Sequence, residues 1–191
     1  MKEQPSLGKT VSELQLTVEE FKKALRETVF ETRREKSVIF GPPRQNYRWP
    51  QVFVLMPFSV ELKPIYENHI KKTVSELKLR VGRADDFFGA GPIMQDIWSA
   101  IHAARIVVAD CTGRNPNVFY EIGLAHAIGR HTILISQSLD DIPFDLRHLR
   151  IILYQYTPPG MTKFEEDLIK TIKESKELNS SQARSDSASA P

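Results

Sequence analysis

Two carboxylates fall within helical faces that otherwise carry apolar side chains. In residues 110–129, DCTGRNPNVFYEIGLAHAIG, the pair Asn115-Pro116 predicts the start of a helix. On that helix Glu121 shares one face with four apolar residues, Val118, Leu124, Ala125 and Ile128. Burying a carboxylate is costly unless something holds it there. There are therefore two interpretations of Glu121. It is either a residue at the border of the apolar face, whose carboxylate reaches solvent or pairs with an arginine, or a group with a chemical role.

A second acid, Asp96, has a comparable position in the preceding helical segment, GPIMQDIWSAIHAA. It shares a face with Ile93, Ala100 and Ala103, although an acid near a helix N-terminus is also favourable on its own. Two acids in apolar faces near one edge of a sheet are typical of acid/base or nucleophilic chemistry, because one can stay ionised while the other holds a proton. We predict Glu121 and Asp96 as the catalytic pair.

Other reactive side chains give weaker signals. Cys111 has no histidine at a plausible partner position, so we expect an inert thiol. His126 and His131 lack a metal-ligand spacing with any Cys or Asp, and we predict no metal site. The segment ADDFFGAGP lacks the Lys-Ser/Thr of a phosphate-binding loop, and no GxGxxG follows the first strand. An ATPase or a dinucleotide-binding Rossmann enzyme is therefore disfavoured, and no cofactor is expected.

A regular succession of apolar runs predicts the elements that must position these groups. Strand-like runs span residues 51–56, 77–82, 105–110, 132–136 and 150–155, and helical patterns lie between most of them. Strands that alternate with helices imply parallel pairing. We predict an α/β fold with an open, mostly parallel five-stranded sheet and helices on both faces, of the flavodoxin-like type.

The chain divides into three parts. We expect residues 1–47 to form an N-terminal helical extension, with a helix at 17–35, and a connector. Residues 48–178 form the α/β domain and end in a closing helix from residue 161. The segment 179–191, NSSQARSDSASAP, has nothing to bury and is expected to be a disordered tail.

Composition restricts the partners. A formal net charge of +2 on 191 residues, with basic and acidic residues interspersed, argues against nucleic acid or a membrane as partner. The single cysteine excludes an internal disulfide and fits a reducing compartment. We see neither the apolar core of a signal peptide nor an apolar run long enough to cross a bilayer, and expect a cytoplasmic protein.

In an open parallel sheet, ligands bind outside the carboxyl ends of the strands. This rule selects four polar or glycine-containing loops, which are MPFS, RADDFFGAGP, DCTGRNPN and SQSLDDIPFD. In the third loop Asn115 can cap the following helix, whose free N–H groups attract anions, and Gly113 permits a close approach by a ligand.

Several motifs carry a family resemblance over residues 51–156. FVLMPF, MQDIWSAIHAARIVVADCTGRNPNVFYEIGLAHAIG, ILIS and IPFDLRHLRIILY resemble the nucleoside 2-deoxyribosyltransferase superfamily, especially its bacterial nucleotide-binding branch, and are also similar to deoxynucleotide N-hydrolases. The resemblance implies cleavage or transfer of an N-glycosidic bond in a nucleoside or nucleotide, without a cofactor. Glu121 in YEIGLA would be the nucleophile that forms a covalent glycosyl-Glu intermediate, and Asp96 in MQDIW the general acid/base.

The resemblance also suggests where the substrate is held. By placement, the expected contacts are Met56, Pro57, Phe58, Asp110, Gly113, Asn115, Asn117, Asp145 and Arg147, with Phe58 as the candidate for stacking on the base. The MPF loop departs from the glycine- or serine-containing stretch of characterised transferases. The TGRNPN loop is about one residue longer than in the hydrolases, so these contacts do not map position by position.

Three alternatives stay open besides this enzyme. The pocket could recognise a nucleotide-like signal without turnover, as a binding or signalling module. The chain could cleave NAD in a defence system, similar to Toll/interleukin-1 receptor (TIR) domains, which also place a Glu on the helix after the third strand; the loop ADCTGRNPN does not look like theirs. The third alternative is a purely structural role. Self-association as a homo-oligomer is also open, supported by the apolar stripe Val18, Phe21, Leu25 and Val29.

Overall fold

The computed structural model describes residues 39–44, 49–86 and 92–188, with side chains described up to Ser175. The chain divides into two compact units, Met1–Pro42 and Pro43–Pro191. All helices and strands of the described residues belong to the second unit. The helix predicted at 17–35 lies outside the described residues.

The second unit is built on one five-stranded sheet in which every pairing is parallel. Its strands, in the spatial order β2-β1-β3-β4-β5, are β2 Val81–Arg83, β1 Val52–Leu55, β3 Ile106–Asp110, β4 Thr132–Ser136 and β5 Ile151–Leu153. The sheet is open and carries helices, so the predicted flavodoxin-like α/β fold is confirmed. The predicted strand at 77–82 starts four residues late, because α2 ends at Glu76 and Lys78 then adopts a left-handed φ of 56°.

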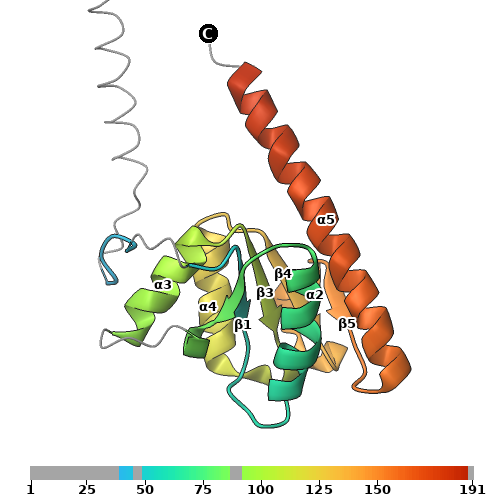
Figure 1. Cartoon of the computed structure of the whole chain (residues 1–191). Helices are drawn as coiled ribbons and strands as arrows, with labels where there is room; N and C mark the ends of the chain where they lie inside the picture. Colours follow the sequence, from blue (N-terminus) through green and yellow to red (C-terminus); the bar gives the residue numbers. More distant parts are fainter. Residues whose placement is uncertain (1–38, 45–48, 87–91, 189–191) are drawn as a thin grey trace, which may run out of the picture. The chain divides into compact units, whose positions relative to one another are not determined.

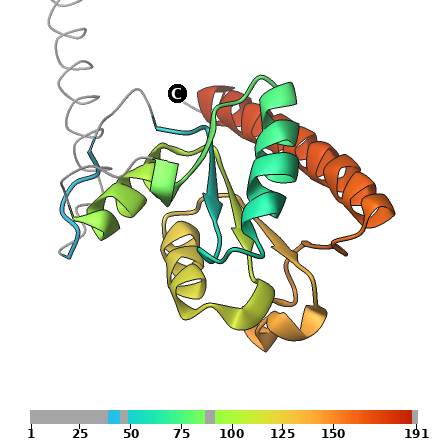
Figure 2. The same ribbon diagram turned by 60° about the horizontal axis from the view of Figure 1, so that its bottom comes forward.

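Helices cover both faces of the sheet (Figure 1). The π-helix η1 (Ile65–Ile70), α2 (Lys71–Glu76) and α5 (Pro158–Ala188) cover one face. The other face carries α3 (Ile93–Ala103) and α4 (Pro116–Ala127), and Figure 2 shows the same two layers from below.

Alternation along the strands distributes the core between these layers. In β1, Val52 and Val54 pack towards α5, whereas Phe53 and Leu55 pack towards α3 and α4, since neighbouring side chains of a strand point to opposite faces. All four are buried, as expected for a central parallel strand. The central pair β1–β3 is in register from Val52↔Ile106 to Leu55↔Ala109.

The C-terminal helix is longer than predicted. We expected it to end near residue 178 and to be followed by a disordered tail, but α5 continues to Ala188. Extending an existing helix needs no new nucleation, and the added segment contains neither Gly nor Pro up to that point. Within the part of the chain that the structure describes, no helix combines the length and apolar character needed to span a membrane.

Candidate functional site

The candidate site lies at the carboxyl edge of the sheet. The chain runs from β1 to β2 on one side and then returns to β3 on the other, so the strand order reverses beside β1 and β3. In this fold that reversal is where ligands bind. The loops after β1, β2, β3 and β4 all emerge at this edge because the strands are parallel. Part of the loop after β2, residues 87–91, lies outside the described residues.

Glu121 occupies the second turn of α4. The helix starts as predicted, with Pro116 at its first position and Asn115 as N-cap, whose Oδ1 accepts a hydrogen bond of 2.9 Å from the Asn117 N–H. Its buried stripe is Val118, Ile122 and Ala125. Glu121 lies at the border of this stripe and is itself partly buried.

The carboxyl of Glu121 makes no hydrogen bond or ion pair with the residues that the structure describes. Burial alone raises its pKa to about 7, because desolvation disfavours the charged form. A carboxyl that titrates near neutral pH at a ligand-binding edge is a candidate for proton transfer or nucleophilic attack.

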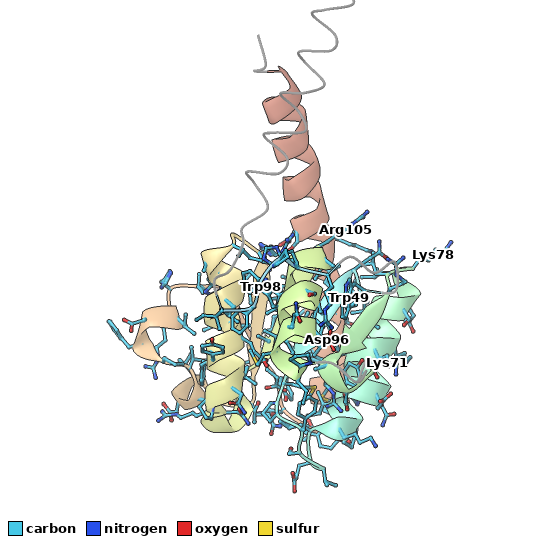
Figure 3. The ribbon with its side chains drawn as sticks, turned by 90° about the vertical axis from the view of Figure 1, so that its left-hand side faces the viewer. Trp49, Lys71, Lys78, Asp96, Trp98 and Arg105 are labelled. Carbon is cyan, nitrogen blue, oxygen red and sulfur yellow. The ribbon has the colours of Figure 1, made fainter. Side chains whose placement is uncertain are left out.

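Asp96, by contrast, has a partner. It lies in the first turn of α3, and its Oδ1 is 3.2 Å from Nη1 of Arg44. Arg44 is held in place twice more, because its N–H donates to Oγ of Ser99 at 2.9 Å and its carbonyl accepts from Nε1 of Trp49 at 3.0 Å. Asp96 and Trp49, both labelled in Figure 3, are thus joined through Arg44.

The two predicted catalytic acids therefore share a layer but differ in surroundings. Asp96 and Glu121 lie in the first two turns of α3 and α4, which pack on the same face of the sheet and both begin at its carboxyl edge. Asp96 sits in an ion pair, whereas Glu121 is a partly buried carboxyl without one among the described residues. The sequence did not indicate Arg44, because its contact with Asp96 spans 52 positions.

Asp110, predicted to contact substrate, is completely buried at the end of β3. Its Oδ1 accepts a hydrogen bond of 3.0 Å from the Thr112 N–H, and its Oδ2 accepts one of 2.7 Å from the Tyr154 hydroxyl. Burial raises its pKa despite these bonds. Both carboxyl oxygens accept hydrogen bonds from other residues of the chain, so Asp110 holds the loop that follows β3 in place.

The rest of the third loop is also tied to the protein itself. Gly113 adopts φ 76°, which favours glycine, and its N–H donates to Oδ2 of Asp141 at 3.1 Å. The N–H of Asn117 is used by the cap of Asn115, and the Asn117 side chain is exposed. Arg114 reaches across to the Asp140 carbonyl. The third and fourth loops thereby form one connected rim.

The three predicted substrate contacts in the loop after β1 differ in burial. Met56 is buried in the core beneath α5 and Pro57 is partly buried, but the Phe58 side chain is 62% exposed. The guanidinium carbon of Arg83 lies 5.0 Å from the centroid of the Phe58 ring, within cation–π range. Stacking of Phe58 on a base stays a prediction.

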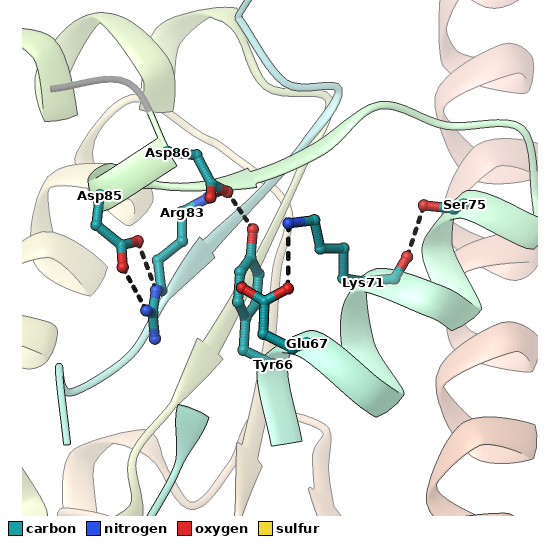
Figure 4. Close-up of polar contacts among 7 residues, drawn as sticks. All are labelled: Tyr66, Glu67, Lys71, Ser75, Arg83, Asp85 and Asp86. Carbon is teal, nitrogen blue, oxygen red and sulfur yellow. Dashed lines mark hydrogen bonds and ion pairs between the residues drawn. The ribbon is translucent and has the colours of Figure 1, made fainter. Parts of the chain in front are cut away.

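Arg83, which the sequence analysis did not select, is the centre of a polar cluster at the end of β2 (Figure 4). It is only 4% exposed, its guanidinium lies over the Tyr66 ring at 4.7 Å, and it forms a two-pronged ion pair with Asp85. The hydrogen bonds from Arg83 lower the pKa of Asp85. The Tyr66 hydroxyl donates to Asp86. Nη1 of Arg83 is buried without a hydrogen-bond partner in the described residues.

Asp145 and Arg147 lie on the fourth loop at the short helix η5 (Phe144–Leu146) and are both exposed. Nε of Arg147 donates to the Ile142 carbonyl at 3.0 Å, which shapes the loop. Cys111, in contrast, is buried, and burial raises the pKa of its thiol to about 12. A thiol held in that form is unreactive at neutral pH, in keeping with the predicted inert residue.

Comparison with known proteins adds structural relatives but no sequence family. No protein-family model matches the sequence, and no curated protein matches it. Among solved structures, the TIR domain of the Toll-related receptor TRR-2 from the lower metazoan Hydra magnipapillata is similar to this chain, with a TM-score of 0.50 and 12% identity. The match covers 63% of this chain and 98% of that domain. At this identity the likeness concerns the fold.

Proposed function

We propose that this protein cleaves the N-glycosidic bond of a nucleoside or nucleotide, with Glu121 facing the anomeric carbon. The observation that carries the proposal is a partly buried carboxyl at the carboxyl edge of the sheet, with its pKa raised to about 7 and no partner among the described residues. Such a group costs stability in the absence of ligand, which is typical of functional carboxyls. The resemblance of YEIGLA to the nucleophile motif of the nucleoside 2-deoxyribosyltransferase superfamily supports the same residue.

The chemistry follows from the charge of the reacting sugar. As the bond between the anomeric carbon and the base nitrogen breaks, the base leaves with the electron pair and positive charge develops on the sugar. The ionised form of Glu121 stabilises that charge and forms a glycosyl ester with the anomeric carbon. Water, or a second base, then forms a bond to the anomeric carbon while the bond from that carbon to Glu121 breaks, so that Glu121 leaves as a carboxylate and the proton lost by the nucleophile passes to solvent.

The ion pair of Asp96 bears on the identity of the leaving base. In its ion pair with Arg44, Asp96 accepts a hydrogen bond through Oδ1 and is not free to act as the donor to a neutral purine or pyrimidine. A pyridinium base, as in NAD, needs no proton because it leaves as a neutral molecule. We therefore favour a nucleotide with a cationic base, and the fold likeness to a TIR domain agrees with this choice.

The test is direct. Purified protein is incubated with NAD, deoxynucleosides and their 5′-monophosphates, and free base is measured by chromatography. We expect base release by the wild type and a loss of at least about a thousandfold in Glu121→Gln. The control Glu76→Gln removes an exposed acid from α2, on the other face of the sheet, and should keep full activity. Equal activity of Glu121→Gln and wild type would contradict the proposal.

A non-catalytic signalling module is the second candidate. It is favoured by the structural relative, which is a domain of a Toll-related receptor. Under this reading the site binds a nucleotide-like ligand without turnover. Retained ligand, no released base from any compound, and undiminished binding by Glu121→Ala would together select it.

A further inference from the structure

A separate pocket of about 410 Å³ lies in the layer of η1 and α5, on the face of the sheet opposite to Glu121. It is lined by His69 of η1, by residues 156–158 ahead of α5, and by Met161, Thr162 and Glu165 in the first two turns of α5. Figure 1 shows α5 beside α2, the helix that continues η1. None of these residues belongs to the site around Glu121.

The pocket contains an oriented carboxylate–imidazole pair. Nδ1 of His69 is 2.6 Å from Oε1 of Glu165, and both side chains are about a quarter exposed. A carboxylate in this position fixes the orientation of the ring and leaves Nε2 as the other polar atom. No hydrogen bond to Nε2 is found within the described residues. His69 lies on a π-helix, a rare element that is frequent at functional sites.

Several polar atoms of the pocket are acceptors. Glu165 offers its second carboxylate oxygen, and the Thr162 hydroxyl can accept because its proton goes to the Pro158 carbonyl at 3.1 Å. The backbone N–H groups of Gly160 and Met161 at the start of α5 are not free for an anion. The first two residues of that helix are prolines, and the N–H groups of Gly160 and Met161 are bound by the Oγ1 and carbonyl oxygens of Thr157. A ligand that brings donors and positive charge fits this lining.

The remaining walls are apolar or aromatic. Tyr156, half exposed, meets the His69 ring edge-on with centroids 6.2 Å apart and an interplanar angle of 87°. Pro158 and the buried Met161 add aliphatic surface. An aromatic face beside a carboxylate attracts organic cations through both charge and the ring quadrupole.

We propose that this pocket is a second ligand site, independent of Glu121, for a small organic cation. The ligand class is an amidinium or primary ammonium group on an aromatic or apolar stem. Its head donates to Glu165 and Thr162 and its stem lies against Tyr156 and Met161.

The test uses three probes of similar shape on the full chain, measured by titration calorimetry. Benzamidine is the cation, benzyl alcohol the neutral control and benzoate the anion. We expect benzamidine to bind with a dissociation constant of about 1 mM or tighter, and at least about tenfold more tightly than either control. Glu165→Gln should weaken benzamidine binding about tenfold. Glu166→Gln removes an exposed neighbouring charge outside the pocket and should leave binding unchanged.

Further variants keep the outcome interpretable. Tyr156→Ala removes a half-exposed ring and should weaken binding several-fold even if Glu165→Gln fails to fold. Glu121→Ala should bind benzamidine like the wild type, and loss of binding in that variant would place the probe at the other site and overturn the proposal. Absence of saturable binding, benzoate binding as tightly as benzamidine, or equal effects of the Glu165 and Glu166 variants would also overturn it.

Discussion

The Tyr154 hydroxyl donates a 2.7 Å hydrogen bond to Oδ2 of Asp110, the one acid in the described residues that is completely buried. Asp110 ends β3 and Tyr154 follows β5, so the bond passes over the end of β4 and joins the edge of the sheet to its centre. Burial raises the pKa of Asp110, and the Tyr154 and Thr112 hydrogen bonds oppose that shift. The buried hydrogen bond between Tyr154 and Asp110 therefore supports the rim formed by the third and fourth loops.

Tyr154→Phe tests that contact. The ring keeps its packing on Phe164, whose centroid is 5.0 Å away, but the buried carboxyl loses a donor. We expect the free energy of unfolding to fall by about 1–3 kcal/mol, the cost of leaving a buried acceptor unsatisfied. Urea denaturation measures the change. Tyr156→Phe, which alters an exposed hydroxyl, should change stability by less than about 0.5 kcal/mol. A similar loss in both variants would mean that the hydrogen bond contributes nothing.

The raised pKa of Glu121 makes stability depend on pH. In the folded protein its pKa is about 7, against a usual value of 4.5. Between these values the folded state binds more protons than the unfolded state, so stability falls as pH rises through this window. The loss in the free energy of unfolding that ionisation of Glu121 causes is absent below about pH 4.5. At 1.36 kcal/mol per pKa unit, this penalty reaches about 3 kcal/mol above pH 7.

Glu121→Gln removes this penalty. Urea denaturation at pH 8.5 should show the variant about 2–3 kcal/mol more stable than the wild type, and the gap should close towards pH 4.5. Glu166→Gln, an exposed acid on α5, should show no such pH-dependent gap. A gap that is the same at both pH values would contradict burial as the cause of the raised pKa of Glu121.

Arg83 and Asp85 should be energetically coupled. Arg83→Met leaves an aliphatic stem between Phe58 and Tyr66 but removes the charge, the ion pair and both cation–π contacts. We expect a loss of about 1–3 kcal/mol, below the range for fully buried pairs because Asp85 is partly exposed. Arg105→Met, at an exposed arginine, should be nearly neutral.

A double-mutant cycle of Arg83→Met with Asp85→Asn isolates the pair. The loss of stability in the double variant should be about 1–2 kcal/mol smaller than the sum of the two single losses, since each single change already breaks the same ion pair. Additive losses would show that the rings of Phe58 and Tyr66, and not Asp85, hold the guanidinium.

The sequence predicted what local patterns determine. Alternating strand and helix patterns led to the parallel sheet, and Asn115-Pro116 marked the start of α4 because a cap is a short-range signal. It did not predict that α5 continues to Ala188, since low apolar content argues against a core contact but does not end a helix. β2 was placed early because Leu77 and Leu79 resemble a strand yet follow the last turn of α2.

The partners of the candidate residues escaped prediction for a different reason. Arg44 meets Asp96 across 52 positions and Tyr154 meets Asp110 across 44, and no periodicity encodes such pairs. An arginine directly after a predicted strand, as at Arg83, was a usable signal. A buried guanidinium requires partners, and the acids of the adjoining ADD segment supply one of them.

The Arg44–Asp96 pair makes a prediction about leaving bases. If the base carries a positive charge in the substrate, as in NAD, neither residue has to deliver a proton, so Arg44→Met and Asp96→Asn should each change kcat/KM for NAD by less than about fivefold. If the base is neutral in the substrate, Asp96 is its proton donor, and Asp96→Asn should lower kcat/KM for deoxynucleosides by about 10²–10⁴.

Arg44→Met distinguishes these roles from a structural one. It removes the guanidinium and leaves the Asp96 carboxyl without its ion pair. If Asp96 acts on the leaving base, the ratio of base released from deoxynucleosides and from NAD should change by about tenfold or more. Equal losses on both substrates would instead show that the ion pair only holds the chain at Arg44 against α3.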